Sequence, residues 1–356
     1  MRFAVRHLLA CLALALAATA LQAAPLRPKD QVLFMPGTAR VLPDGQYELD
    51  VHAWLYHKSR IRGVNRALAH FLDIDLPQLT PAARGRFEER TGLFHTESND
   101  ERHISIVLDG ATEPLPLPRT EDNGRSNARV VVAAAQVRSK DPFVRFHAWT
   151  AVGDSRRFQG QALLVPPEGL SVVSDIDDTI KKTHVRDRHE MLLNTFARQF
   201  KPVPDMALRF RLLSAADANT RFHYVSGSPI QLYPPLADFL RDSAFPPGSV
   251  HLRESTTWRT LLTTDATRAH KLAAVERLMQ DFPQRRFLLV GDSGESDPET
   301  YAELARRHPT RVVAVLIRDV TDETRESPRY VSAFQDVDPA RWHVLVDGAA
   351  WPALPR

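Results

Sequence analysis

The chain has 356 residues, with 46 lysine and arginine residues against 43 aspartate and glutamate residues and a formal net charge of +3. This near balance gives no electrostatic basis for nucleic-acid binding, so we expect no nucleic-acid partner. The length suggests two domains, and the apolar and charged fractions, 43% and 25%, are ordinary for a globular protein.

Residues 1–24 have the pattern of a cleavable signal peptide. A basic start with Arg2 precedes an apolar run over 8–21 that is short for a membrane span, and small residues lead to a cleavage site beside Ala24. A retained N-terminal anchor is the alternative. We expect an exported protein, periplasmic or secreted. Because the single cysteine, Cys11, lies in this segment, the mature chain would have no disulfide and no thiolate.

Residues 25–165 alternate between apolar and polar positions and contain several turn sequences, a pattern typical of strands. The expected strands are 32–34, 47–51, 103–108, 130–133 and 144–149. A helical segment over 62–94 interrupts them. We predict a β-rich domain, a sandwich with an inserted helical segment. Because no acidic set follows its strands, we expect this domain to take part in substrate or surface recognition rather than in chemistry.

After a boundary at 165–169, short apolar strands alternate with helices. The expected strands are 171–176, 222–225, 287–290, 312–317 and 343–346, and the expected helices are 191–200, 207–216, 232–241, 269–281 and 299–308. This order predicts an α/β domain over 166–356, with a parallel sheet covered by helices on both faces. In such sheets the chemistry lies beyond the carboxyl ends of the strands.

Acidic residues follow two of these strands. Asp175 and Asp177 come after the first, and Asp292 comes after the strand at 287–290. A carboxylate can attack phosphorus and form an aspartyl-phosphate. Clustered carboxylates also repel one another unless a cation lies among them, and oxygen ligands near a phosphate suit Mg²⁺. The alternative is that these residues cap a turn and a helix. We predict a Mg²⁺ site with Asp175, Asp177 and Asp292 as metal residues.

Four further residues are candidates for phosphate binding and its support. Ser226 and Gly227 follow an apolar strand and could cradle a phosphoryl oxygen, or form a simple turn. Lys271 could neutralise a phosphate, or be a solvated surface lysine. Asp297 could hold a metal-bound water or orient Lys271, or cap the following helix.

Together these residues resemble the motifs of haloacid dehalogenase phosphatases. The sequence Asp-Ile-Asp-Asp-Thr over 175–179 resembles their first motif, Asp-x-Asp-x-Thr. Ser226 matches the second motif, Lys271 the third, and Asp292 with Asp297 the fourth. The resemblance implies a Rossmann-like parallel sheet of haloacid dehalogenase type.

A narrower resemblance is to the phosphatidate phosphatase domain of the actin-patch-associated type, a distant relative of the lipins. It rests on the segments 174–181, 224–229, 270–271 and 291–299 and covers about 169–320. It implies a phosphatase whose substrate is a phospholipid at a membrane surface.

The resemblance also implies a role for each residue. Asp175 attacks phosphorus, and Asp177 protonates the leaving alcohol and then activates water. Mg²⁺ is held by Asp175, the main-chain carbonyl of Asp177, and Asp292. Ser226 and Lys271 hold the phosphoryl oxygens. This division agrees with phosphoryl transfer in general, where positioning and charge neutralisation do most of the work.

The substrate stays open at this point. The expected export signal departs from eukaryotic relatives that work at intracellular membranes, and the short segment 182–221 predicts no large lid domain. Three functions remain: a phosphatase for a lipid phosphate such as phosphatidate, a phosphatase for a soluble phosphomonoester, and a binding protein with a vestigial phosphatase fold. The sequence does not identify a protein partner of the β-rich domain.

Overall fold

The computed structural model of the protein describes residues 24–58, 64–98, 100–137, 142–254 and 264–353. The expected signal peptide lies, except for Ala24, outside these residues. In the described part of the chain, no helix is both long enough and apolar enough to cross a bilayer.

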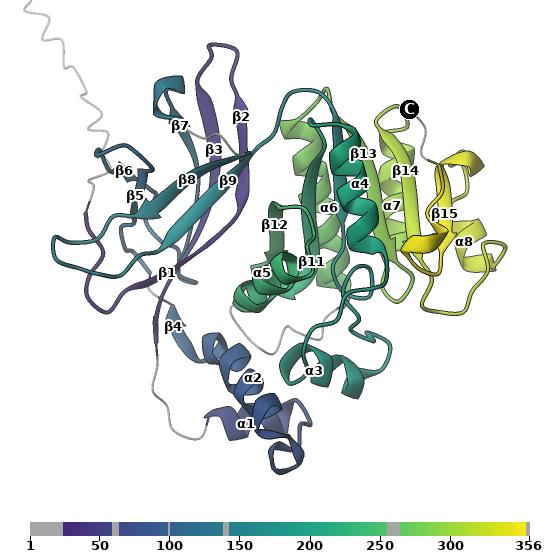
Figure 1. Cartoon of the computed structure of the whole chain (residues 1–356), viewed down its shortest axis with the longest axis horizontal. Coiled ribbons are helices and arrows are strands. Elements are labelled where there is room, and N and C mark those ends of the chain that lie inside the picture. The colour runs from purple at the N-terminus through teal and green to yellow at the C-terminus, as the bar shows by residue number, and fades with distance from the viewer. Residues whose placement is uncertain (1–23, 59–63, 99, 138–141, 255–263, 354–356) are drawn as a thin grey trace, which may run out of the picture.

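A nine-stranded sheet occupies the N-terminal part of the chain, and Figure 1 shows it beside the second sheet. Its strands are β1 (Gln31–Met35), β2 (Gly37–Val41), β3 (Tyr47–Lys58), β4 (Thr96–Ser98), β5 (Ser105–Leu108), β6 (Leu115–Pro116), β7 (Arg125–Val132), β8 (Phe143–Ala148) and β9 (Gln159–Leu164). The predicted β-rich region is therefore confirmed.

These nine strands form one continuous sheet rather than the two separate sheets of the expected sandwich. The connection is made by β2, which pairs antiparallel with β3 and parallel with β9. At Gly37 an added Cβ would lie 1.9 Å from the main-chain oxygen of Asp50, so only glycine allows β2 to start this close to β3. The apolar residues of both halves still share one core.

A helical insertion over residues 64–95 lies between β3 and β4. It comprises α1 (Val64–Phe71), η1 (Leu76–Gln78), α2 (Pro81–Thr91) and η2 (Gly92–His95). Thr80 starts α2, because its side chain accepts a hydrogen bond from the amide of Ala83 and Pro81 is suited to the first helical position. The predicted helical segment is confirmed, and Figure 1 shows it beside α3 (Arg188–Phe196).

The second sheet has six parallel strands in the order β12-β11-β10-β13-β14-β15. They are β10 (Leu170–Ser174), β11 (Arg221–Pro229), β12 (Gly248–Arg253), β13 (Arg286–Asp292), β14 (Val312–Arg318) and β15 (Trp342–Leu345). The remaining helices are α4 (Met206–Ala216), η4 (Ile230–Leu232), α5 (Tyr233–Asp242), α6 (Thr264–Asp281), α7 (Asp297–Arg307), α8 (Pro328–Ala333), η6 (Pro339–Arg341) and η7 (Gly348–Ala350). The predicted parallel α/β sheet is confirmed.

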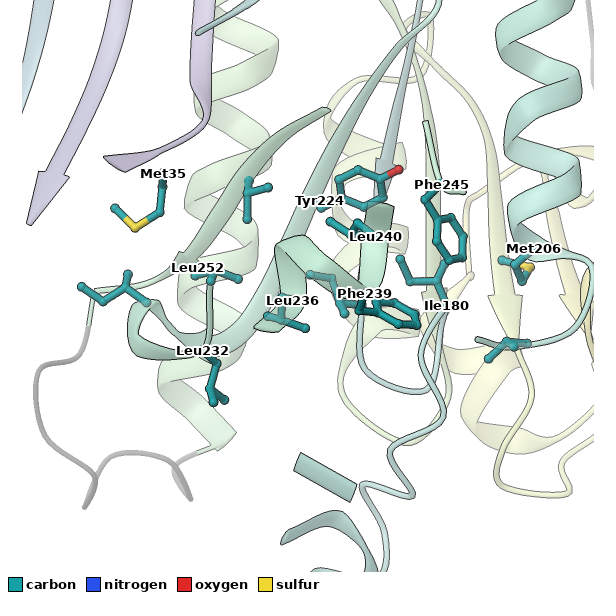
Figure 2. Packing of buried hydrophobic residues seen from close by; sticks show 14 of the residues in the cluster. Met35, Ile180, Met206, Tyr224, Leu232, Leu236, Phe239, Leu240, Phe245 and Leu252 are labelled. Atoms are coloured by element: carbon teal, nitrogen blue, oxygen red, sulfur yellow. The ribbon is translucent and has the colours of Figure 1, made fainter. Parts of the chain in front are cut away.

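Helices cover both faces of this parallel sheet because successive strand residues point to opposite sides. In β13, Leu288 and Val290 belong to the core that includes residues of α3, α4 and α5, whereas Leu289 belongs to the core with α6 and α7. Figure 2 shows part of the first core, where Phe239 and Phe245 pack near Tyr224. Burial of each such side chain contributes about 1.5–3 kcal/mol to the stability of the fold.

The two sheets contact each other along β12. The amide of Val250 donates to the carbonyl oxygen of Pro36 at 2.8 Å, so the edge strand of the parallel sheet is covered by the start of the N-terminal sheet. Arg277 on α6 forms an ion pair with Asp50 of β3 at 2.8 Å. The N-terminal sheet and the parallel sheet are thereby joined to each other.

Candidate active site

The residues singled out from the sequence meet at the carboxyl ends of three neighbouring strands. Asp175 directly follows β10, Ser226 lies in β11, and Asp292 ends β13. Lys271 comes from α6, and Asp297 begins α7. Parallel strands present their carboxyl ends on one edge of the sheet, which is why residues far apart in sequence converge here.

The loop after β10 turns back on itself. The amide of Lys181 donates to the carbonyl oxygen of Ile176 at 2.9 Å. Asp178 has a φ of 56°, in the left-handed region that aspartate tolerates better than most residues. Its carboxylate accepts hydrogen bonds from the amides of residues 183–185. Asp178 therefore closes the loop, and the other two aspartates of this motif are left for chemistry.

Lys271 is a buried cation among carboxylates. Its Nζ lies 2.8 Å from Oδ1 of Asp175, 2.6 Å from Oδ1 of Asp297 and 2.9 Å from Oε2 of Glu295. Its side chain is 1% exposed, so it is not the solvated surface lysine that we considered as an alternative. Lys271 is positioned to attract negative charge at the end of β10.

Burial and mutual repulsion perturb the charges of this cluster. Burial raises the pKa of Asp175 and of Asp292 well above the usual range, and neighbouring carboxylates add to the effect. The pKa of Asp297 is raised as well, first by burial. Burial alone would lower the pKa of Lys271, but the surrounding carboxylates outweigh burial and hold it well above its ordinary value. The single positive charge of Lys271 does not balance the negative charge that these carboxylates would carry together.

Three of these carboxylates form a candidate metal centre. Asp175, Asp292 and Asp297 each offer an oxygen atom, and these atoms lie within 4.8 Å of one another. Thr179 donates to Oδ2 of Asp175 at 2.8 Å, while Oδ1 of Asp175 pairs with Nζ of Lys271 at 2.8 Å. The third carboxylate of this group is Asp297, where sequence reasoning named Asp177. A metal contact from the main-chain carbonyl of Asp177, which the family resemblance implies, stays a prediction.

The side chain of Asp177 is held by a separate set of partners. Oδ1 lies 2.6 Å from Nζ of Lys181 and accepts from Thr183 at 2.7 Å. Oδ2 accepts from Ser226 at 3.1 Å and from Ser228 at 3.0 Å. Burial tends to raise the pKa of Asp177, but the charge of Lys181 and these hydrogen bonds lower it to about 2. Asp177 is therefore ionised and fixed in one orientation.

Ser226 and Gly227 lie where the sequence placed them, at the end of an apolar strand. The amide of Ser228 donates to Oγ of Ser226 at 3.0 Å, which curls the chain around the serine hydroxyl. An added Cβ on Gly227 would meet Cγ2 of Thr267 at 2.5 Å, so α6 packs directly against this turn. Contact of Ser226 and Gly227 with a phosphoryl oxygen stays a prediction.

Sequence reasoning missed four side chains of the site: Lys181, Thr183, Ser228 and Glu295. Lys181 and Thr183 reach Asp177 only because the loop turns back, which a strand-and-helix pattern does not reveal. Ser228 could have been found, because it lies in the same Ser-Gly-Ser turn as Ser226, directly after the apolar strand.

A small cavity of about 70 Å³ opens beside Asp177. It is lined by Asp177, Thr183, Val185, Met191, Leu192, Thr195, Phe196, Gly227, Ser228, Pro229, Leu232, Thr267 and Glu295. One wall comes from α3 and the other from the end of β11 and from η4. Six of the lining side chains are apolar, four carry a hydroxyl group and two are carboxylates, and no lysine or arginine is among them. The cavity suits an uncharged part of a ligand, with apolar contacts from α3 and η4.

Comparison with known proteins finds a family model that covers this site. Residues 170–319 match the family model described as "Phosphatidate phosphatase APP1, catalytic domain". Over 171 residues the chain is 35% identical to phosphatidate phosphatase APP1 of Saccharomyces cerevisiae, covering 47% of this chain and 28% of that protein. An uncharacterized protein of Schizosaccharomyces pombe is 27% identical over 249 residues, covering 65% of this chain and 38% of that protein.

The chain thus spans less than two fifths of the length of these relatives. A solved carbohydrate esterase structure aligns over 81% of this chain and 88% of that chain, but its TM-score of 0.21 and identity of 13% support no argument. The segments that carried the resemblance, from Ser174 to Glu299, lie inside the matched region 170–319. Residues 170–319 are therefore similar to the catalytic domain of phosphatidate phosphatase APP1.

Proposed function

We propose that the protein is a Mg²⁺-dependent phosphomonoester hydrolase that acts on a lipid phosphate such as phosphatidate, through an aspartyl-phosphate intermediate. We also propose that its parallel sheet belongs to the haloacid dehalogenase type. The observation that carries the proposal is the meeting of Asp175, Lys271 and Asp292 at one edge of the sheet, inside the region that matches a phosphatase catalytic domain.

The donor set of the carboxylate cluster fits Mg²⁺. All candidate ligands are oxygen atoms and the group is buried. The negative charge of its carboxylates exceeds the positive charge of the single lysine beside them. Asp175 and Asp292 would hold the ion, with the main-chain carbonyl of Asp177, while Asp297 keeps Lys271 in place. When bound, the ion would neutralise negative charge on the phosphoryl group.

In the proposed first step, a carboxylate oxygen of Asp175 attacks phosphorus. The bond between phosphorus and the alcohol oxygen breaks as the bond to Asp175 forms, and Asp177 gives the leaving oxygen a proton. Lys271 and Ser226 hold the phosphoryl oxygens. Lys271 already lies 2.8 Å from the attacking carboxylate, so a phosphoryl group bound there would be within its reach.

In the proposed second step, water attacks the aspartyl-phosphate while Asp177 takes its proton, which releases inorganic phosphate and frees Asp175. A pKa of about 2 keeps Asp177 in the basic form that this step needs. The proton that Asp177 gives in the first step is taken up when a doubly negative phosphate binds beside it, because nearby negative charge raises the pKa of a carboxyl group.

The cavity beside Asp177 favours a lipid over a soluble phosphomonoester. Half of its lining side chains are apolar, among them Met191, Phe196 and Leu232. A hydroxyl or amide group of a sugar or nucleotide that lies against these three side chains would have no partner there, and burial of an unpaired polar group is costly. The glycerol carbons of a phosphatidate offer apolar surface to this part of the cavity.

The test is phosphate release by the purified protein with Mg²⁺. Phosphatidate in mixed micelles is compared with a sugar phosphate and a nucleoside monophosphate at equal concentration. We expect release from phosphatidate with the highest kcat/KM. A higher kcat/KM for a soluble phosphomonoester would contradict the substrate, and release from none of them would favour a binding protein with a vestigial phosphatase fold.

A further inference from the structure

The wall of the substrate cavity formed by α3 is supported from outside the catalytic domain. Thr195 and Phe196, at the end of α3, line the cavity beside Asp177. Behind them lies the helical insertion of the N-terminal sheet, residues 64–95. Figure 1 shows α2 of this insertion beside α3, and the residue contacts agree.

Arg90 of α2 caps α3. Its Nη1 donates to the carbonyl oxygens of Thr195 at 2.9 Å and of Arg198 at 2.7 Å. The last carbonyl groups of a helix have no partner inside the helix and carry partial negative charge, so a guanidinium group is well suited to them. Arg86 adds a third bond, from Nε to the carbonyl oxygen of Ala197 at 2.9 Å. The end of α3 is therefore held by side chains more than one hundred residues earlier in the chain.

Arg90 is buried where it makes these contacts. It is 7% exposed, and its guanidinium lies 3.8 Å from the ring centroid of Phe200, an attractive cation–π arrangement. Burial lowers its pKa to about 10, and within the described ranges no carboxylate forms an ion pair with it. The planar guanidinium group of Arg90 can bond two carbonyl oxygens and lie over the ring of Phe200 at the same time. The ammonium group of a lysine cannot reproduce this planar arrangement.

Aromatic packing supports the same wall. Phe94 of η2 and Phe87 of α2 both meet Phe196 edge-on, with ring centroids 5.8 and 6.5 Å away. The insertion also contacts η4, which contributes Leu232 to the opposite wall of the cavity. Both walls thus rest on the insertion, whereas the phosphate end, with Asp175 and its partners, rests on β10, β13 and α6.

We propose that the helical insertion sets the shape of the substrate cavity and that Arg90 is its positioning residue, acting on recognition of the alcohol part of the substrate rather than on phosphoryl transfer. This inference rests on the proposed function. When Arg90 is lost, the end of α3 loses two of its three side-chain hydrogen bonds, and Thr195 and Phe196 are held less firmly. A bulky lipid phosphate that touches this wall is affected, and a small aryl phosphate is not.

The test compares Arg90→Met in the full chain with a control on the same helix, Arg84→Met. Arg84 is exposed and donates only within the insertion, to the carbonyl oxygen of Leu76. We expect Arg90→Met to raise KM for phosphatidate in mixed micelles by about tenfold, the effect of about 1.4 kcal/mol. For p-nitrophenyl phosphate, kcat should stay within about threefold, and Arg84→Met should leave both substrates unchanged.

Arg90→Lys should recover part of the loss, because the charge at the helix end returns without the two directed bonds. An equal fall of activity on both substrates, or an unchanged KM for phosphatidate, would overturn the inference. If Arg90→Met does not fold, Arg86→Gln removes one cap only and should show the same split at smaller size.

Hydrogen exchange decides the positioning role independently of turnover. In Arg90→Met, amides at 193–198 should exchange faster, while those of β13 keep their protection. Unchanged protection at 193–198 would contradict the inference. If the native protein released phosphate from no substrate, the proposed function would fail, and the exchange pattern would still show whether Arg90 holds the wall.

Discussion

Replacement of Lys271 by methionine removes the buried cation of the site and keeps most of the side-chain volume. Asp175, Asp297 and Glu295, which lie 2.6–2.9 Å from its Nζ, would then lose their shared partner. Removal of one partner of a buried ion pair costs about 3–5 kcal/mol, because the remaining charge is left uncompensated. We expect a loss of stability of this size, and a fall in kcat of about 10²–10³ from the missing phosphate contact.

The free energy of unfolding is measured by urea titration for the native protein, Lys271→Met and Lys182→Met. Lys182 is an exposed neighbour of the site, so its variant should lie within about 0.5 kcal/mol of the native protein. Adding Asp175→Asn to Lys271→Met removes one unpaired charge and should restore about 1–3 kcal/mol without restoring turnover. A loss below about 1 kcal/mol in Lys271→Met, with turnover retained, would refute the buried pairing.

Three more predictions concern metal, acidity and export. Asp292→Asn should raise the Mg²⁺ concentration needed for half-maximal activity while the fold is kept, and activity that persists in excess chelator would contradict a metal site. Burial holds the pKa of His223 well below 6.5, so its stabilising effect is complete above pH 6.5 and is lost as pH falls, by up to about 1.4 kcal/mol per pH unit. Urea titrations from pH 7 to 5 should show this fall, and His223→Gln should reduce its slope but not abolish it, because burial lowers the pKa of His251 as well, to about 3. N-terminal sequencing should show that the exported protein begins near Ala24. An intact Met1 would contradict the predicted signal peptide.

The site could be predicted from the sequence where position along the strands decides it. Asp175 and Asp292 end apolar strands, and a parallel sheet brings such ends together whatever the loops do. The ionised state of Asp177 could not be predicted, because it depends on the loop that returns Lys181 and Thr183 to it. Short-range patterns do not encode how a loop folds back.

The fold was also predictable in part. The alternation of strands and helices after 169 gave a parallel sheet, but β12 was missed, since its short sequence contains a histidine and begins with glycine. The continuous N-terminal sheet depends on the close approach at Gly37, which is a tertiary contact. Arg90 bonds the end of α3 over sequence separations of 105 and 108 positions, so neither segment carries a local pattern that predicts the contact.

The central claim is that Asp175 is the nucleophile and Asp177 the proton-transfer group. Asp177→Asn cannot activate water, but with p-nitrophenolate as a good leaving group it should still be phosphorylated. Rapid-quench labelling with radioactive aryl phosphate should therefore accumulate phosphoprotein in this variant, with the label on Asp175, and Asp175→Asn should give neither label nor turnover. A label on another residue, or ordinary turnover by Asp175→Asn, would contradict the account and favour direct attack by water.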